Sequence, residues 1–245
     1  MLRAPAVAAT AAQHAAAVPA AAAAVRALSA GAAAHGAPAA HPAGAAGAPG
    51  AALTPEQKRR IDSMLRVDHA GEIGANYIYM GQRAVLGRDP YLRGLLDHMW
   101  EQEKTHLRVF DSVLADNRVR PSALRPLWEA AGFALGVGTA MLGKEAAMAC
   151  TEAIETAIGD HYNSQIRELL ELESDPEITK LTEARSRRRA CAFWSLYIIR
   201  QFRDDELEHL ETAVDHEAAK APAYPLLTGV IKAGCAAAIW VASRV

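Results

Sequence analysis

The sequence predicts an all-α protein from residue 53 onward, and three observations support this prediction. Beyond a few residues, no stretch alternates apolar and polar side chains with the period of two that a half-buried strand requires. The pairs Thr54-Pro55 and Asp89-Pro90 are typical helix-start signals. Apolar side chains then recur in rows seven residues apart, as in helices that pack together. We therefore expect a helical bundle.

The expected helix boundaries follow from capping residues and prolines. Thr54 caps a first helix that ends near Gly87, and Gln57 completes a capping box. Asp89-Pro90 starts a second helix that ends near Arg120, just before a proline. The remaining expected elements are an apolar helix over Leu127–Gly143, a helix from about Lys144 to Glu173, a segment that opens at Asp175-Pro176, and a last helix that follows Pro222 and Pro225 and ends at Val245.

The first 50 residues differ sharply in composition from the rest. They contain 26 alanines and no Asp or Glu, and their only Lys or Arg residues are Arg3 and Arg26. A secretory signal would need a compact apolar region beside a basic end. We therefore expect residues 1–52 to be a low-complexity leader, a mitochondrial transit peptide, and residues 53–245 to form the bundle. A compositionally biased tail without a targeting role is the alternative.

Charge and cysteine content exclude several classes of partner and site. The formal net charge of −2 gives no electrostatic reason to expect a nucleic-acid partner. The three cysteines, Cys150, Cys191 and Cys235, lack the spacing of a disulfide framework or a CxxC metal site. We expect a reducing compartment.

Two apolar segments, Leu127–Gly143 and Leu226–Val241, bear on location. Glu129 interrupts the first and Lys232 the second, and each is shorter than the ~20 apolar residues that cross a bilayer. We expect two additional apolar helices that face a membrane interface, with ordinary core helices as the alternative.

Charged side chains interrupt the apolar rows at six positions. Two helices each carry a Glu-x-x-His pair in the row, and two others carry a single Glu. The six residues are Glu72, Glu103, His106, Glu155, Glu206 and His209. Unpaired charges inside a dry core cost several kcal/mol each. We therefore expect a cationic group to offset them.

An internal duplication of a helix pair relates these positions. The pattern Glu101-x-Glu103-x-x-His106-Leu107 matches Asp204-x-Glu206-x-x-His209-Leu210, and Glu72, Tyr79 and Gln82 have the spacing of Glu155, Tyr162 and Gln165. The repeat favours Glu155 over its neighbour Glu152, which has no counterpart.

This ligand set fits a dinuclear carboxylate centre in a four-helix bundle. Such centres take one Glu from each of two helices and a Glu-x-x-His from each of the other two. Residues three apart share a helix face and can hold one ion together. Oxygen-rich donors with one imidazole per ion favour iron or manganese. Polar bundle residues paired with Arg or Lys are the alternative.

The motifs resemble those of the demethoxyubiquinone hydroxylases, over about residues 61–245. The segments that carry the resemblance are Leu65-Arg66-Val67-Asp68-His69-Ala70-Gly71-Glu72, Met99-Trp100-Glu101-Gln102-Glu103-Lys104-Thr105-His106, His161-Tyr162-Asn163-x-Gln165-Ile166 and Phe202-Arg203-Asp204-Asp205-Glu206-Leu207-Glu208-His209.

The resemblance implies a ferritin-like bundle with two iron ions (Fe2+/Fe3+), held by the six residues above. The implied reaction is a monooxygenation that uses O2 to hydroxylate the ring of demethoxyubiquinone or demethoxyubiquinol. It also implies that His161 and Tyr162 lie close to the metals and the quinone. NADH is the implied electron donor, acting through the bound quinone, with a separate reductase as the alternative.

The same resemblance implies a peripheral position on the matrix side of the mitochondrial inner membrane. The expected partners are inner-membrane lipid and other ubiquinone-biosynthesis proteins, including a lipid-binding one, and a homodimer is a candidate assembly. A ferritin-like iron-storage or ferroxidase protein is the second functional reading. A metal-free scaffold is the third.

One region departs from the family pattern, because the chain is longer between Asp175-Pro176 and Phe202. A single helix from Pro176 to Ala219 would extend ~65 Å, far beyond its partners. We therefore expect a break or loop around Ala184–Tyr197, with an error in the gene model as the alternative. The basic run at residues 185–189 is expected to be solvated, with contact to anionic lipid as its alternative.

Overall fold

The computed structural model describes the backbone of residues 54–174 and 186–245 and the side chains of residues 54–171 and 196–245. Within those residues all regular secondary structure is helical, which confirms the all-α prediction. The elements are α2 (Pro55–Leu86), α3 (Pro90–Asn117), α4 (Arg125–Met141), α5 (Lys144–Ser174), α7 (Ser186–Asp215), the 3-10 helix η1 (Ala218–Lys220) and α8 (Tyr224–Ala242). The expected leader, residues 1–52, lies outside the described residues.

The first two helices begin where the capping residues predict. The Thr54 hydroxyl oxygen accepts a hydrogen bond from the Gln57 amide at 3.2 Å, and the Gln57 side chain accepts one from the Thr54 amide at 2.8 Å. Asp89 likewise accepts a hydrogen bond from the Tyr91 amide at 2.8 Å. Helix α3 ends three residues earlier than expected, because Arg118 adopts a left-handed conformation with φ of 55°.

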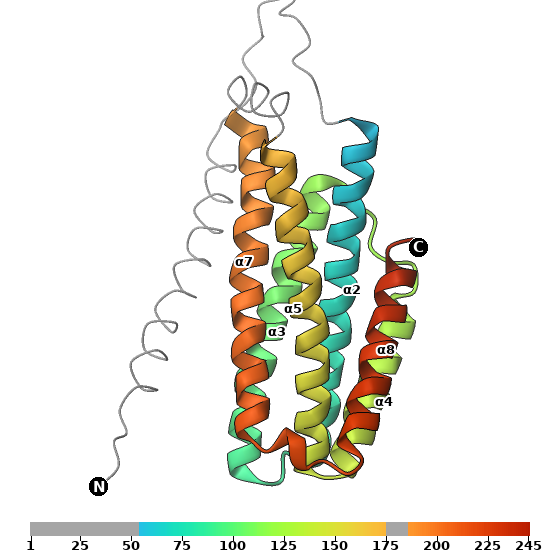
Figure 1. Cartoon of the computed structure of the whole chain (residues 1–245), viewed down its shortest axis with the longest axis vertical. Coiled ribbons are helices and arrows are strands. Elements are labelled where there is room, and N and C mark those ends of the chain that lie inside the picture. The colour runs from blue at the N-terminus through green and yellow to red at the C-terminus, as the bar shows by residue number, and fades with distance from the viewer. Residues whose placement is uncertain (1–53, 175–185) are drawn as a thin grey trace, which may run out of the picture. The chain divides into compact units, whose positions relative to one another are not determined.

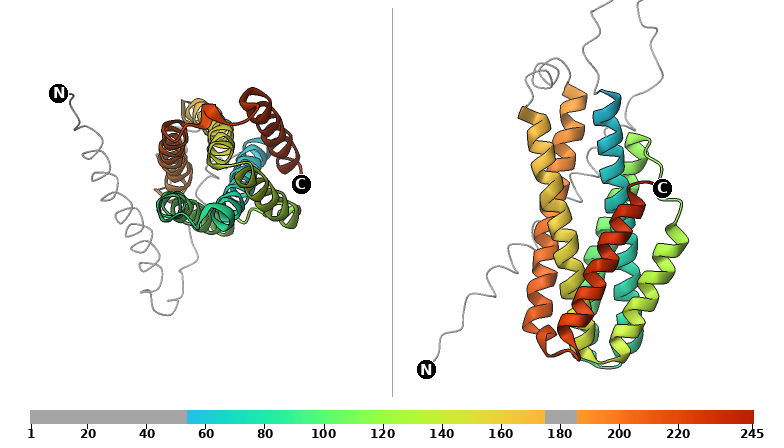
Figure 2. Two further views of the ribbon diagram at one scale, coloured as in Figure 1. Left: turned by 90° about the horizontal axis from the view of Figure 1, so that it is seen from below. Right: turned by 45° about the vertical axis from the view of Figure 1, so that its right-hand side comes forward.

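Helices α2, α3, α5 and α7 form a four-helix bundle (Figures 1 and 2). Each packs against two of the others, in the order α2, α3, α7, α5 around the bundle. Figure 1 shows α2 and α7 running in one direction and α3 and α5 in the other. The chain therefore needs a crossover between α3 and α5, which α4 provides. A bundle with one crossover has the ferritin-like connection.

Helix α4 packs closely on α2 through glycines. A Cβ atom on Gly136 would lie 2.1 Å from the carbonyl oxygen of Ile78, and one on Gly132 would lie 2.6 Å from that of Gly74. In the reverse direction, a Cβ atom on Gly81 would lie 2.6 Å from the carbonyl oxygen of Phe133. The two backbones therefore approach at a distance that only glycine permits.

Helices α4 and α8 both cover the side of the bundle formed by α2 and α5, as the end-on view in Figure 2 shows. Their outward faces are apolar. The large exposed apolar residues are Leu127, Phe133 and Met141 on α4 and Leu226, Val230 and Trp240 on α8. The prediction of two additional apolar helices beside the bundle is confirmed.

Helix α8 is longer than the apolar segment expected from the sequence. It spans 19 residues with a mean hydropathy of 1.6 and only 17% burial over its most apolar window. By length and composition alone, α8 is long and apolar enough to cross a membrane, and it is the one such helix among the described residues. The expected segment was shorter because it left out Tyr224, Pro225 and Ala242, which are helical.

The predicted break around Ala184–Tyr197 is wrong for residues 186–197, which form a continuous part of α7. This helix contains no Gly or Pro from Ser186 to Asp215, so nothing local ends it. Its 30 residues match the 28 to 32 residues of its three bundle partners. Residues 175–185, which include Asp175-Pro176, lie outside the described part of the chain, as do the side chains of the basic run.

Candidate metal centre

Six buried acidic and imidazole side chains converge in the middle of the bundle. Helices α2 and α5 each contribute one Glu, and α3 and α7 each contribute a Glu and a His three residues later. The residues are Glu72, Glu103, His106, Glu155, Glu206 and His209, none more than 1% exposed. The structure therefore brings together every residue that the sequence predicts as a metal ligand.

The six residues form two overlapping groups, each with ligand atoms within 4.8 Å of one another. One group, here called the His106 site, consists of Glu72, Glu103, His106 and Glu206. The other, the His209 site, consists of Glu103, Glu155, Glu206 and His209. Glu103 and Glu206 belong to both groups. Two adjacent cations that share two carboxylates would fit this arrangement.

The two imidazoles point their Nδ1 atoms into the cluster. Nδ1 of His106 lies 3.3 Å from Oε1 of Glu206 and 3.5 Å from Oε2 of Glu72. Nδ1 of His209 lies 3.2 Å from an oxygen of Glu103 and 3.2 Å from an oxygen of Glu206. Each ring therefore offers one nitrogen to the shared space between the carboxylates.

Buried atoms without hydrogen bonds concentrate in this cluster. Among the described residues, the unpartnered buried atoms include Oε2 of Glu72, both carboxylate oxygens of Glu103, Nδ1 of His106, Oε2 of Glu155, both carboxylate oxygens of Glu206, and Nδ1 of His209. Leaving such atoms unpaired costs on the order of 1–3 kcal/mol each. Coordination to cations would satisfy all of them, so the donor set fits a pair of metal ions.

Burial also shifts the acid–base chemistry of the cluster. It raises the pKa of Glu72 to about 8 and raises the pKa values of Glu103 and Glu155 as well. For Glu206, the nearby imidazoles of both histidines outweigh burial and lower the pKa. Without cations, the cluster therefore retains protons near neutral pH, among them the one on Glu72. Metal binding would have to displace those protons.

The pKa values of the two histidines move upward. Burial lowers them, but the surrounding carboxylates outweigh it and raise the pKa values of His106 and His209 well above the usual value. The cluster thus favours positive charge at its centre, whether from protons or from metal ions.

Two tyrosines each bind a carboxylate on the neighbouring helix. The Tyr162 hydroxyl group on α5 donates to Oε1 of Glu72 on α2, and the Tyr79 hydroxyl group on α2 donates at 2.7 Å to Oε1 of Glu155 on α5. Burial and the nearby carboxylates raise the pKa of both tyrosines, so each keeps its proton. The two contacts are counterparts in the internal repeat.

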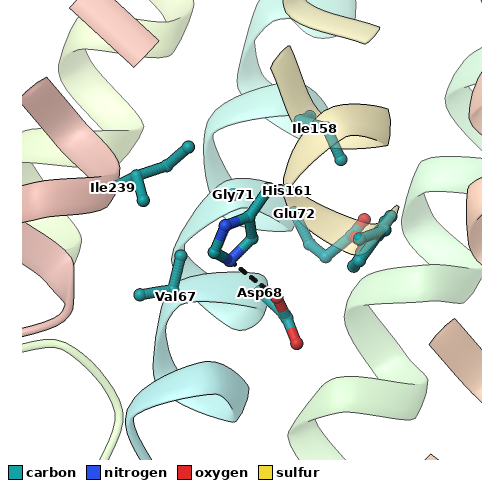
Figure 3. Close-up of a pocket in the computed structure, with 8 residues that line it drawn as sticks. Val67, Asp68, Gly71, Glu72, Ile158, His161 and Ile239 are labelled. Carbon is teal, nitrogen blue, oxygen red and sulfur yellow. Dashed lines mark hydrogen bonds and ion pairs between the residues drawn. The ribbon is translucent and has the colours of Figure 1, made fainter. Parts of the chain in front are cut away.

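A small pocket reaches the cluster from the side covered by α8 (Figure 3). Its lining comes from α2, α5 and α8 and consists of Val67, Asp68, Gly71, Glu72, Ile158, His161, Tyr162 and Ile239. Apart from its charged and hydroxyl groups, the lining is apolar. Glu72 therefore connects the carboxylate cluster to an opening at the apolar side of the protein.

The two predicted catalytic residues, His161 and Tyr162, occupy different places at this pocket. Tyr162 contacts Glu72 directly. Nε2 of His161 lies 3.5 Å from Oδ1 of Asp68 (Figure 3). Gln165 donates to the same oxygen at 2.7 Å. His161 thus belongs to a neighbouring polar group in the pocket wall. The catalytic role of both residues stays a prediction.

The partners of the two histidines were not predicted from the sequence. Nε2 of His106 lies 3.0 Å from Oδ2 of Asp205, and Nε2 of His209 lies 3.0 Å from Oε1 of Gln102. The repeat did pair two other acids with the motif, Glu101 and Asp204, but their side chains are 67% and 52% exposed and bind Lys104 and Arg203. Their place in the sequence could have identified them, since Gln102 and Asp205 each directly precede a Glu of the cluster.

Comparisons with known proteins agree with the geometry. The family model described as "Ubiquinone biosynthesis protein COQ7" matches residues 59–242. The NADPH-dependent 3-demethoxyubiquinone 3-hydroxylase of Mus musculus is 53% identical over 184 residues, or 75% of this chain and 77% of the relative. The mitochondrial 5-demethoxyubiquinone hydroxylase of Saccharomyces cerevisiae is 47% identical over 79% of this chain and 82% of its own. The 3-demethoxyubiquinol 3-hydroxylase of Rhodospirillum rubrum is 49% identical over 78% and 81%.

Proposed function

Because the chain belongs to the COQ7 family of ubiquinone biosynthesis proteins, we propose that it hydroxylates the ring of demethoxyubiquinone or demethoxyubiquinol at a centre of two iron ions. The observation that carries this proposal is the pair of overlapping sites that share Glu103 and Glu206 inside the bundle. The names of the relatives supply the substrate, and the donor set of the cluster supports the metal.

Two iron ions, when bound, supply O2 activation and electron transfer to the reaction. The six residues of the cluster would hold them, with Glu103 and Glu206 between the two sites. Asp205 and Gln102 fix the imidazole rings so that Nδ1 of each histidine faces inward. The protein thus positions its donors before any ion arrives.

The pocket beside Glu72 is where we place the quinone ring. Val67, Ile158 and Ile239 give it apolar walls that suit a ring, and its volume of about 30 Å³ means that it has to widen to admit one. The Tyr162 hydroxyl group lies between the pocket and the cluster and holds its proton against Glu72. Asp68 and Gln165 orient His161 at the pocket wall. A ring in this pocket would lie next to the carboxylate that belongs to the His106 site.

The apolar outer faces of α4 and α8 suit a protein that receives a lipid-soluble quinone. Ile239, which lines the pocket, belongs to α8, whose other side exposes Val230 and Trp240. We place the protein in the mitochondrion, as a peripheral protein on the matrix side of the inner membrane, with residues 1–52 as the transit peptide. The mitochondrial names of several relatives support the mitochondrion as its compartment.

A reduced nicotinamide nucleotide is the proposed electron donor. The prediction from sequence is NADH, whereas the relatives from Mus musculus and Homo sapiens are named NADPH-dependent. Assays with each nucleotide on the purified protein distinguish the two donors. Other ubiquinone-biosynthesis proteins and inner-membrane lipid remain the proposed partners.

Quinone profiling tests the proposed function. Cells that lack the protein should accumulate demethoxyubiquinone, and the purified protein should contain about two iron ions per chain. Normal ubiquinone in those cells would overturn the hydroxylase assignment, whatever the metal content. Uptake of many iron ions per chain, without any quinone defect, would instead support the ferritin-like storage function.

A further inference from the structure

The two histidines of the cluster differ in the group behind them. His106 faces the carboxylate of Asp205, whereas His209 faces the side-chain amide oxygen of Gln102, each at 3.0 Å from Nε2. The internal repeat makes Gln102 and Asp205 equivalent, since each directly precedes a shared Glu. One site therefore has an anionic acceptor where the other has a neutral one.

The acceptor of His106 is also the better fixed of the two. Asp205 is only 7% exposed, and its Oδ1 accepts a second hydrogen bond from Gln201 at 3.2 Å. Gln102 is half-buried. A hydrogen bond to an ionised acceptor is roughly twice as strong as one to a neutral acceptor, and a buried setting screens it less.

The two sites have otherwise equivalent ligands. Glu103 and Glu206 serve both sites, and each site adds one further carboxylate that accepts a hydrogen bond from a tyrosine. The histidines also pack on different rings, since His106 stacks on Phe202 and His209 meets the edge of Tyr79, but neither ring carries a charge. Among the groups that hydrogen-bond to the ligands of the two sites, Asp205 makes the difference in formal charge.

One more acid lies near the same side, and it has its own partner. Asp68 stands where the repeat places Thr151, and Gln165 donates to Asp68 as Gln82 donates to Thr151. Nε2 of His161 lies 3.5 Å from the Asp68 carboxylate, and burial raises the pKa of Asp68. Asp68 is thus paired with Gln165 and His161 rather than with a histidine of the cluster.

We propose that Asp205 makes the His106 site the tighter of the two cation sites, so that the first metal ion binds there. A carboxylate that accepts the outer N–H of a histidine makes the ring a stronger donor to a metal on its other nitrogen, and removal of such a partner typically weakens metal binding 10- to 100-fold. Asp205 is thus a positioning residue that orders the loading of the centre. This inference rests on the proposed metal centre and does not depend on the hydroxylation.

Anaerobic iron titration of the metal-free full-length protein tests the proposal. A competing chelator gives the two dissociation constants, and Mössbauer spectroscopy at half an equivalent of 57Fe(II) reports which site fills first. The wild-type protein should give one dominant quadrupole doublet and two constants that differ by at least ~10-fold.

Two substitutions change the charge of the groups that accept from the histidines and leave the shape of the side chains almost unchanged. Asp205→Asn should weaken the tight site by ~10- to 100-fold, and Gln102→Glu should tighten the other site. The double variant should give a different dominant doublet at half an equivalent, because the His209 site then fills first. Far-ultraviolet circular dichroism and thermal unfolding check that each variant folds. Gln102→Glu keeps the test decisive if Asp205→Asn folds poorly.

Two results would overturn the inference. One is a pair of equal doublets with equal constants in the wild-type protein. The other is an unchanged loading order in both single variants and in the double variant. A wild-type protein that binds no iron would overturn the proposed centre itself, and that outcome is distinct from two equal iron sites.

Discussion

The Tyr79 hydroxyl group on α2 donates a 2.7 Å hydrogen bond to Oε1 of Glu155 on the neighbouring helix α5. Its counterpart in the repeat is the hydrogen bond from Tyr162 to Glu72. The two tyrosines are equally buried, but only Tyr162 also lines the pocket. The internal duplication therefore provides a natural control for the role of Tyr162.

Replacement of each tyrosine by phenylalanine separates its contribution to stability from its contribution to catalysis. Both Tyr79→Phe and Tyr162→Phe leave a carboxylate without its donor, so each should lower the free energy of unfolding by about 1 kcal/mol or more. Only Tyr162→Phe should also lower kcat for quinone hydroxylation, by at least ~10-fold. Equal kcat values for the two variants would remove the proposed role of Tyr162 beside the substrate.

The metal-free protein should lose stability as the pH rises from about 5 to about 8. Burial raises the pKa of Glu72 from 4.5 to about 8, so the folded state holds a proton that the unfolded chain has already released. The raised pKa values of His106 and His209 act in the same direction above pH 6.5. Urea unfolding at several pH values measures this slope.

Metal loading provides the control for that experiment. Because cations replace the bound protons, the iron-loaded protein should show a weaker loss over the same pH range, and iron binding should release protons. Stability of the metal-free protein that rises between pH 5 and 8 would contradict the protonated state of the cluster.

The close contact between α2 and α4 should not tolerate a methyl group. Gly136→Ala places a Cβ atom 2.1 Å from the Ile78 carbonyl oxygen, so we expect a loss of about 1–3 kcal/mol in the free energy of unfolding. On the same helix, a Cβ atom on Gly138 has no neighbour within 4 Å, and Gly138→Ala should be neutral or slightly stabilising. Chemical unfolding of both variants makes the comparison.

The outward face of α8 should contribute to membrane binding. Val230→Glu places a charge on this face, where the side chain is 63% exposed, and should weaken binding to phospholipid vesicles by roughly tenfold or more. Val214→Glu on α7 is the matched control, at 53% exposure on the bundle itself. Vesicle cosedimentation that responds equally to both substitutions would argue against α8 as the membrane-facing element.

Local signals and periodicity predicted most of the fold and the six residues of the cluster. Thr54 and Asp89 mark helix starts because their side chains bond to nearby amides, and Glu103 and His106 stand out because they interrupt an apolar row. These features depend on residues within one helix. The internal repeat then linked helices that lie far apart in the sequence.

The features that sequence reasoning missed depend on contacts between helices. Asp205 reaches His106 from another helix, so its role follows only from how α3 and α7 face each other. The predicted break around Ala184–Tyr197 was wrong for residues 186–197, because helix length alone does not show where a helix starts, and α7 is continuous from Ser186.

Iron content of a Glu103 variant tests the central claim most directly. Glu103 belongs to both cation sites, whereas Glu101, two residues earlier, is 67% exposed and paired with Lys104. The wild-type protein and Glu101→Gln should each retain about two iron ions per chain, and Glu103→Gln should retain less than about one. Two iron ions per chain in Glu103→Gln would contradict a centre built on the shared carboxylates.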